Sequence, residues 1–147
     1  MISNAWVWKR ELKKELKAFN KFLAKTNVRD AAGDDYLYLK LEKFFFTTSF
    51  IIRKLFESYK LSEELASINV PVERYKRIDI EKKINLFTNY DILRYYDVDN
   101  PAKSSLGAMK LCNCFIHSFN FAPVLDEESG KLVGVHINSD HDKDKFL

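Results

Sequence analysis

The alternation of apolar and polar positions changes twice along the chain. In the first segment the apolar residues recur at steps of three and four, the spacing of one helix face. These residues are Ala5, Trp8, Leu12, Leu16, Phe19 and Leu23. Ser3 or Asn4 precedes them, and either side chain can accept a hydrogen bond from the first helical turn. The pattern therefore predicts a first helix that ends near Ala24.

A second helix is predicted from Asp35 to Tyr59, after a loop at 26–33 with Asp34 as its cap. Its main apolar side consists of Leu37, Leu41, Phe44, Thr48, Ile52, Leu55 and Tyr59. A second apolar strip, on another side, consists of Leu39, Phe46 and Phe50. A helix that is apolar on two sides lies either at the centre of a fold or at an oligomer interface.

The middle of the chain has a weaker pattern. Ser62 to Ala66 predicts one short helical piece with acidic residues in its first turn. Residues 68–80 predict an extended or irregular segment, and residues 81–96 predict a further helix. Asn100 and Pro101 are a good cap and a good first helical residue, so they predict a last helix from Pro101 to Phe119.

The C-terminal part has the two-residue period of strands. Phe121 to Leu125 and Lys131 to Asn138 flank the turn-forming residues 126–130 and predict a β-hairpin near residues 119–138. With only four Gly and three Pro, long helices are favoured elsewhere. The predicted fold is one mainly α domain over residues 1–147. It is a bundle of about four to five helices with a C-terminal β-hairpin.

The placement of charge is more informative than its total. The net charge of +3 is too small to indicate a nucleic-acid partner by itself. The first helix, however, carries a row of cations opposite its apolar side: Arg10, Lys14, Lys17, Lys21 and Lys25. The row is either a solvated helix face or a track for RNA phosphates, and Trp6 lies near it as a residue that can stack on a base.

The cysteines and the apolar runs bear on the compartment. Cys112 and Cys114 point about 200° apart on a helix, which predicts two free thiols in a reducing cytoplasm. No apolar run reaches the length of a membrane span, and we expect neither a signal peptide nor a membrane partner. The acidic tail around His141 is either a weak divalent-metal site or exposed charge. We expect no metal and no cofactor.

Lys110, Asn113 and His117 form the main candidate for chemistry. Their spacings of three, four and seven residues place them on one side of the predicted last helix. A cation, an amide and an imidazole in one row can bind a phosphate or transfer protons. Alternatively, Asn113 and His117 are buried polar groups that hydrogen-bond to neighbouring helices.

This row resembles the motif of the HEPN superfamily, in which an Arg, often followed by a polar residue, precedes a His on the last helix of a small bundle. Asn113 and His117 match the polar residue and the His, Cys112 stands at the Arg position, and Lys110 is the nearest cation. The family fold is helical, and many members cut RNA without a metal or act as toxins and antiviral effectors. Two subunits usually combine their motifs, so the resemblance implies a homodimer.

Two functions follow as expectations. Cys112 in place of Arg favours a non-catalytic domain that binds RNA or a protein in a bacterial regulatory or defence setting. The alternative is a metal-independent ribonuclease at a dimer interface. In it His117 moves protons, Lys110 stabilises phosphoryl charge and Asn113 orients the phosphate. The chain contains neither a Gly-rich phosphate loop nor a serine-hydrolase or zinc-protease motif, which disfavours those enzyme classes.

Overall fold

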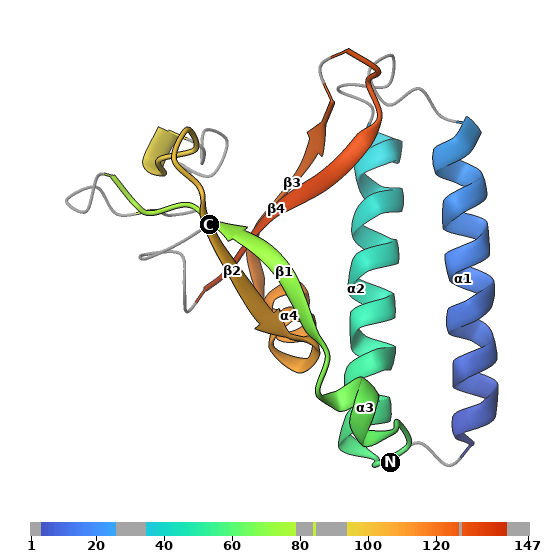
Figure 1. The fold of residues 1–147 in the computed structure, drawn as a ribbon. Helices are drawn as coiled ribbons and strands as arrows, with labels where there is room; N and C mark the ends of the chain where they lie inside the picture. The colour runs from blue at the N-terminus through green and yellow to red at the C-terminus, as the bar shows by residue number, and fades with distance from the viewer. Residues whose placement is uncertain (1–3, 26–34, 79–83, 85–93, 127, 141–147) are drawn as a thin grey trace. The chain divides into compact units, whose positions relative to one another are not determined.

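The computed structural model describes residues 4–25, 35–78, 84, 94–126 and 128–140 (Figure 1). The chain divides into two compact units. Unit 1 comprises Met1–Ser62 and Ala122–Val135, and unit 2 comprises Glu63–Phe121 and His136–Leu147. The predicted loop at 26–33, the Asp34 cap, most of the predicted helix at 81–96 and His141 lie outside the described residues. The single domain over residues 1–147 stays a prediction.

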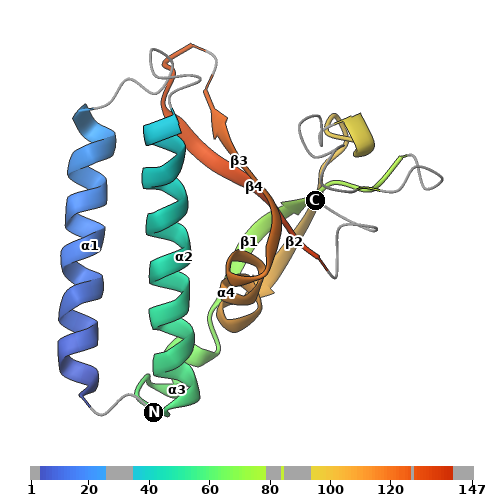
Figure 2. The ribbon, with the colours of Figure 1, turned by 180° about the vertical axis from the view of Figure 1, so that it is seen from behind.

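Unit 1 is built on two helices, α1 (Ala5–Lys25) and α2 (Asp35–Glu57). They run antiparallel and side by side in both views (Figures 1 and 2). Asn4 caps α1, since its Oδ1 accepts a hydrogen bond from the backbone N–H of Val7 at 3.4 Å. Both predicted helices are therefore confirmed, with ends within two residues of those expected.

Aromatic stacking and aliphatic packing join α1 to α2. The rings of Phe19 and Phe44 stack with centroids 3.7 Å apart and planes 3° from parallel. Ala5 and Leu12 of α1 pack against a buried pair on α2, Ile51 and Leu55. Full burial of one Leu or Ile side chain stabilises a fold by roughly 1.5–3 kcal/mol. The helix pair is therefore held mainly by apolar burial.

The expected apolar sides need correction at several positions. Ile51 is buried on α2, whereas the prediction placed Ile52 in the main stripe. Tyr59 was predicted to lie on the apolar side, but it is 94% exposed because α2 ends two residues before it. On α1, Trp8 and Leu16 are exposed, because they lie at the two edges of the apolar side, and Leu12 and Phe19 between them make the contacts with α2.

Unit 2 contains a two-stranded antiparallel sheet. One short helix precedes its first strand along the chain, and another follows its second strand. Strands β1 (Asn69–Arg74) and β2 (Ala102–Gly107) pair from Asn69↔Gly107 to Arg74↔Ala102. Helix α3 (Glu63–Ala66) precedes β1, and helix α4 (Ala108–Ile116) follows β2. The short helix at 62–66 and the extended character after residue 68 are confirmed.

The predicted helix from Pro101 to Phe119 is wrong at both ends. Its first part forms β2, because Ser104 and Ser105 are weak helix formers and pair instead with β1. Asn100 does not cap a helix: its Nδ2 donates to both carboxylate oxygens of Asp97, at 2.9 and 3.1 Å. Only nine residues, Ala108–Ile116, are helical.

The C-terminal hairpin is confirmed as β3 (Ser118–Leu125) and β4 (Leu132–Ser139). At its turn the Gly130 N–H donates to the Asp126 carbonyl at 2.8 Å, and Gly130 has a φ of 65°, which glycine adopts without strain. Asp126 Oδ1 accepts hydrogen bonds from the backbone N–H and hydroxyl of Ser129, at 2.7 and 2.6 Å. The described fold thus mixes helix and strand, whereas the prediction was a mainly α bundle with a C-terminal hairpin.

The interior of unit 2 combines apolar and polar side chains. Among the described residues its buried apolar side chains are Tyr96, Ile84, Cys112 and Phe115, at 1–7% exposure. The Tyr96 hydroxyl oxygen accepts a hydrogen bond from Asn138 Nδ2 at 2.8 Å, and Asn138 is itself buried. Among the described residues, three buried amide atoms have no hydrogen-bond partner: Asn113 Oδ1, Asn120 Nδ2 and Asn138 Oδ1.

Candidate functional site

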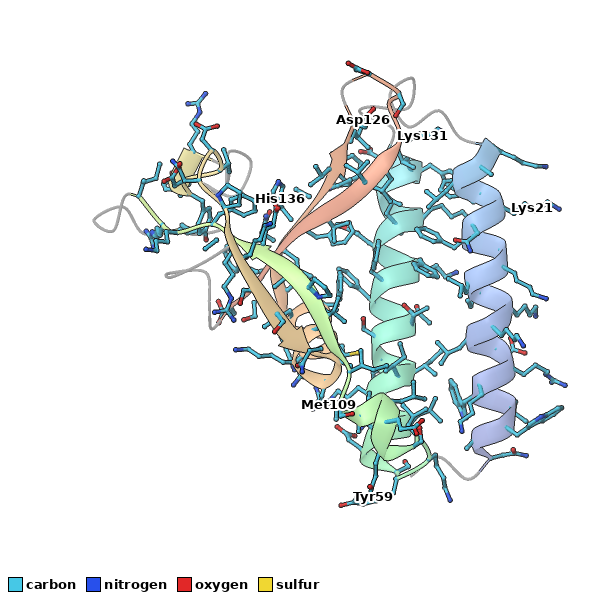
Figure 3. All side chains as sticks on the ribbon, viewed as in Figure 1. Lys21, Tyr59, Met109, Asp126, Lys131 and His136 are labelled. Atoms are coloured by element: carbon cyan, nitrogen blue, oxygen red, sulfur yellow. The ribbon has the colours of Figure 1, made fainter. Side chains whose placement is uncertain are left out.

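The cations of α1 all lie on its solvent side. Arg10, Lys14, Lys17, Lys21 and Lys25 are exposed, as the row predicted from the sequence requires. Lys21, labelled in Figure 3, extends away from α2. Lys9 and Lys13 are exposed as well. They were not predicted as part of the row, although their helical spacing from its members places them on the same side of α1.

These seven cations occupy one continuous arc of α1. At 100° per residue they span about 160° around the helix, and both acidic residues, Glu11 and Glu15, lie outside that arc. α1 holds seven of the 24 basic residues and two of the 21 acidic ones, a net charge of +5, so the rest of the chain carries −2. The positive charge of this protein is therefore concentrated on α1. We call these seven residues the basic face: Lys9, Arg10, Lys13, Lys14, Lys17, Lys21 and Lys25.

Trp6 lies within the arc of the basic face. Its side chain is 66% exposed, and the guanidinium carbon of Arg10 lies 4.8 Å from the centre of its ring. Such a cation–π contact fixes the orientation of the indole next to a positive charge. The Lys14–Glu11 ion pair, at 3.5 Å, is largely exposed and neutralises little of the face.

Tyr59 was missed as a candidate because the sequence placed it inside. It follows α2 in a Schellman motif: the Tyr59 N–H donates to the Phe56 carbonyl and the Lys60 N–H donates to the Leu55 carbonyl, both at 2.9 Å. In this motif the residue just after the helix cap takes a left-handed backbone. Here that residue is Tyr59, with a φ of 55°. A residue other than glycine in that conformation costs roughly 1–2 kcal/mol. An exposed aromatic ring is thus held in a strained position.

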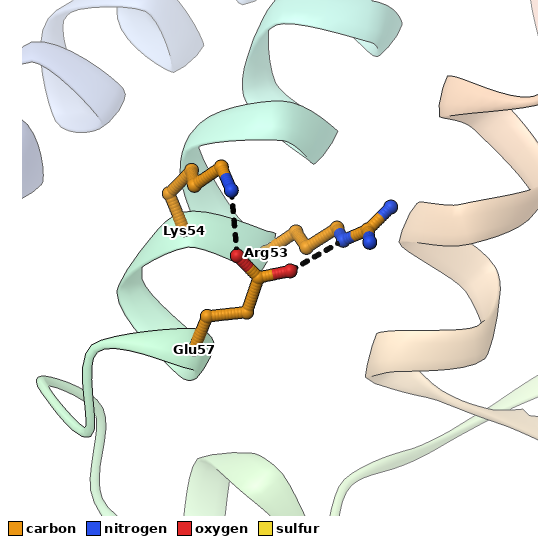
Figure 4. A network of polar contacts seen from close by, with 3 residues as sticks. All are labelled: Arg53, Lys54 and Glu57. Atoms are coloured by element: carbon orange, nitrogen blue, oxygen red, sulfur yellow. Dashed lines mark hydrogen bonds and ion pairs between the residues drawn. The ribbon is translucent and has the colours of Figure 1, made fainter. Parts of the chain in front are cut away.

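A compact ion network precedes Tyr59 on α2 (Figure 4). Glu57 accepts a hydrogen bond from Lys54 Nζ at 2.7 Å and one from Arg53 Nε at 2.8 Å. These two hydrogen bonds lower the pKa of Glu57, and the one from Lys54 has the larger effect. The carboxylate is therefore ionised and engaged by two cations, and the three residues together carry a charge of +1.

The Lys110, Asn113 and His117 row lies on α4 and at its C-terminal end. Lys110 and His117 are exposed, while Asn113 is half-buried and its Oδ1 is buried without a hydrogen-bond partner. His117 ends α4 with a non-helical φ of −110°, but its N–H still donates to the Asn113 carbonyl at 2.9 Å. Cys112, at the position of the family Arg, is buried. The three residues thus lie on and at the end of one short helix, and they differ in exposure.

His136 lies on β4 beside aromatic and acidic neighbours. Its ring contacts that of Tyr75 edge-on at 5.2 Å, and the Tyr75 hydroxyl donates to Glu73 Oε2 at 2.8 Å. Burial lowers the pKa of His136, and the Glu73 carboxylate opposes this shift. Burial raises the pKa of Tyr75, and its hydrogen bond to Glu73 raises it further. The histidine is therefore held in its neutral form.

Two findings limit the classes of site within the described residues. No group of three or more His, Cys, Asp or Glu side chains is placed to hold a metal ion among residues 4–25, 35–78, 84, 94–126 and 128–140. In the same part of the chain no helix combines the length and apolar character that crossing a bilayer requires.

Comparison with known proteins gives no match: no family model, no curated protein and no solved structure is significantly similar to this chain.

Proposed function

We propose that this protein is a non-catalytic RNA-binding protein whose binding surface is the basic face of α1. The observation that supports this function is the concentration of seven exposed cations in one arc that excludes both glutamates of the helix. Cations in a continuous row release counterions from a phosphate backbone, and this release supplies most of the affinity of sequence-independent binding.

Trp6 favours a nucleic acid over an acidic protein or a membrane. An exposed indole next to a guanidinium offers a flat surface on which a base can stack, and such stacking contributes roughly 1–3 kcal/mol. A helix that binds a bilayer surface inserts its apolar side among the lipids. In α1 that side packs against α2, through Phe19 and Leu12. RNA is thus the polyanion that fits both the exposed indole of Trp6 and the cations of the basic face.

The test removes three of these charges without adding negative ones. We compare Lys14→Gln/Lys17→Gln/Lys21→Gln with a matched control, Lys43→Gln/Lys76→Gln/Lys131→Gln, whose three lysines are also exposed. Binding to a fluorescein-labelled 20-nucleotide RNA is measured by anisotropy over a range of KCl concentrations. Each lost phosphate contact reduces the salt slope by about 0.7, so the triple variant should lose about two units of slope and bind about 100-fold more weakly at 0.1 M salt.

Equal effects of the two triple variants would mean that net charge alone acts and would refute the α1 site. Binding of the parent protein to anionic vesicles with higher affinity than to RNA would instead assign the basic face to membranes. If polyglutamate bound as tightly as RNA, the basic face would be assigned to an acidic protein partner.

Metal-independent RNA cleavage is a second proposed function, supported by the exposure of Lys110 and His117. An exposed imidazole can exchange protons with a 2′-hydroxyl, and an exposed ammonium can approach the phosphoryl oxygens. The resemblance to the HEPN superfamily, and the homodimer that it implies, belong to this proposal. So does a role in bacterial regulation or defence.

Cleavage is tested by incubating the protein with single-stranded and structured RNA in EDTA. The proposal expects cleavage that His117→Ala abolishes while binding through α1 remains. If the parent protein leaves both RNAs intact, or if His117→Ala cleaves at the parental rate, the proposal is wrong. Light scattering of the same samples tests the homodimer.

A further inference from the structure

We propose that Tyr59 is a second base-stacking residue of this site and that the ligand is single-stranded RNA. The inference rests on the proposed function, because it assigns a further residue and a strand class to the same surface.

Tyr59 and Trp6 lie at the same end of the helix pair. Ala5, next to Trp6, packs against the buried pair Ile51 and Leu55 near the end of α2, and Leu61, two residues after Tyr59, packs against the same pair. Figure 1 shows the first turn of α1 beside the last turn of α2, and Figure 3 labels Tyr59 at that end. The two exposed rings therefore lie at the same end of the helix pair.

The ring of Tyr59 contributes little to the packing of the fold. It is 94% exposed, so it removes almost no apolar surface from water. It also occupies the left-handed position of a Schellman motif, where glycine would be relaxed. Strained residues of this kind are concentrated at binding sites. Recognition of a flat ligand accounts for an aromatic ring at a position that favours glycine.

The charges around Tyr59 suit a phosphate chain. Lys60 follows it and is exposed. Glu57, the nearby carboxylate, is hydrogen-bonded to both Arg53 and Lys54, so this acid does not leave a net negative charge beside the ring. Arg53, Lys54, Glu57 and Lys60 together carry a charge of +2 at this end of α2.

Two exposed rings select the single-stranded form. In a duplex the bases are stacked on one another, and their faces are inaccessible to a side chain without unstacking. A single strand can place successive bases on aromatic rings while its phosphates follow the cations. A duplex would use the cations alone, so removal of an aromatic ring should affect the two ligands differently.

The experiment uses the full chain with Tyr59→Gly, Tyr59→Phe and, as a control at the other end of α2, Tyr38→Ala. Tyr38 is also an exposed aromatic residue, at 42%. Affinity for a labelled 20-nucleotide oligouridine and for a 20-base-pair RNA duplex is measured by anisotropy, and Tm by circular dichroism. Tyr59→Gly should raise Tm by about 3 °C, since it removes backbone strain, and should weaken oligouridine binding about tenfold. Duplex binding should be unchanged, and Tyr59→Phe and Tyr38→Ala should bind as the parent does.

A loss of affinity in a variant that is more stable than the parent cannot be attributed to unfolding. Parental oligouridine affinity of Tyr59→Gly would overturn this inference and leave the α1 site intact. An equal loss for the duplex, or a loss in Tyr59→Phe, would overturn stacking as the reason. If the parent protein binds neither RNA, the proposed function itself is wrong, and this inference with it.

Discussion

The two units of this protein differ in the polar side chains that they bury: among the described residues Ser49 is buried in unit 1, whereas Asn120, Asn138 and Ser139 are buried in unit 2. Unit 1 buries aliphatic side chains on α2, namely Leu37, Leu41, Ile51 and Leu55, and stacks Phe19 on Phe44. Unit 2 buries Tyr96 with Asn138 and includes buried amide atoms that have no partner. The difference is instructive because the proposed RNA site belongs to unit 1, where a firmly packed helix pair holds the cations in a fixed row.

An apolar interior and a polar one respond differently to substitution. Apolar contacts are non-directional, so their loss scales with the volume removed. A buried hydrogen bond matters chiefly through the penalty for the partner that remains unpaired. Two substitutions and one change of pH separate these responses.

The largest effect is expected for Leu41→Ala in unit 1. Leu41 is fully buried, and the cavity left by its side chain should lower the free energy of unfolding by about 3 kcal/mol. Leu39→Ala on the same helix is the matched control, because Leu39 is 56% exposed and should change stability by less than about 0.5 kcal/mol. Urea denaturation measures both. Equal effects would mean that unit 1 is not packed as described.

A smaller effect is expected for Tyr96→Phe in unit 2. The substitution keeps the ring and removes the hydroxyl that accepts from Asn138 Nδ2, so it should destabilise by about 1–2 kcal/mol. Tyr95→Phe is the control, since Tyr95 packs on the same cluster but is only partly buried. Adding Asn138→Leu to Tyr96→Phe should recover part of the loss. If the double variant is less stable than Tyr96→Phe, the polar pair is not the reason for the effect.

The smallest effect is expected from pH, through His136. Burial holds its pKa below the ordinary value of 6.5, so the unfolded chain binds the proton more readily than the folded one. The stability from neutral His136 is fully present above pH 6.5 and is lost as the pH falls through the folded-state pKa. Thermal unfolding at pH 7.5 and pH 5.5 should show a larger fall in Tm for the parent than for His136→Gln. Parallel falls would exclude His136 as the source.

The sequence predicted the helix pair of unit 1 well because its periodicity extends over many residues. In α1 the cations and the apolar residues repeat on opposite sides, and tertiary packing agrees with that repeat. The segment from Pro101 to Gly107 is too short to contain a repeating pattern that identifies its structure. Its local preference for a helix start was overridden by pairing with β1, a partner some thirty residues away that no local pattern indicates.

The candidate sites divide in the same way. The exposure of Arg10, Lys14 and Lys21 follows from helical spacing alone. The half-burial of Asn113 does not, because it depends on which side of α4 is covered. Tyr59 could not be found from spacing, since its exposure results from a chain reversal that begins only two residues earlier.

The way α1 begins has a kinetic consequence. Its first turn contains no acidic residue, so no carboxylate of that turn neutralises the partial positive charge of the helix macrodipole. That partial charge adds to Lys9 and Arg10 next to Trp6. The electrostatic potential that attracts a polyanion is thereby strengthened at this end of α1. For the proposed RNA ligand, encounter should be directed toward the aromatic end, and the association rate constant should fall steeply with ionic strength.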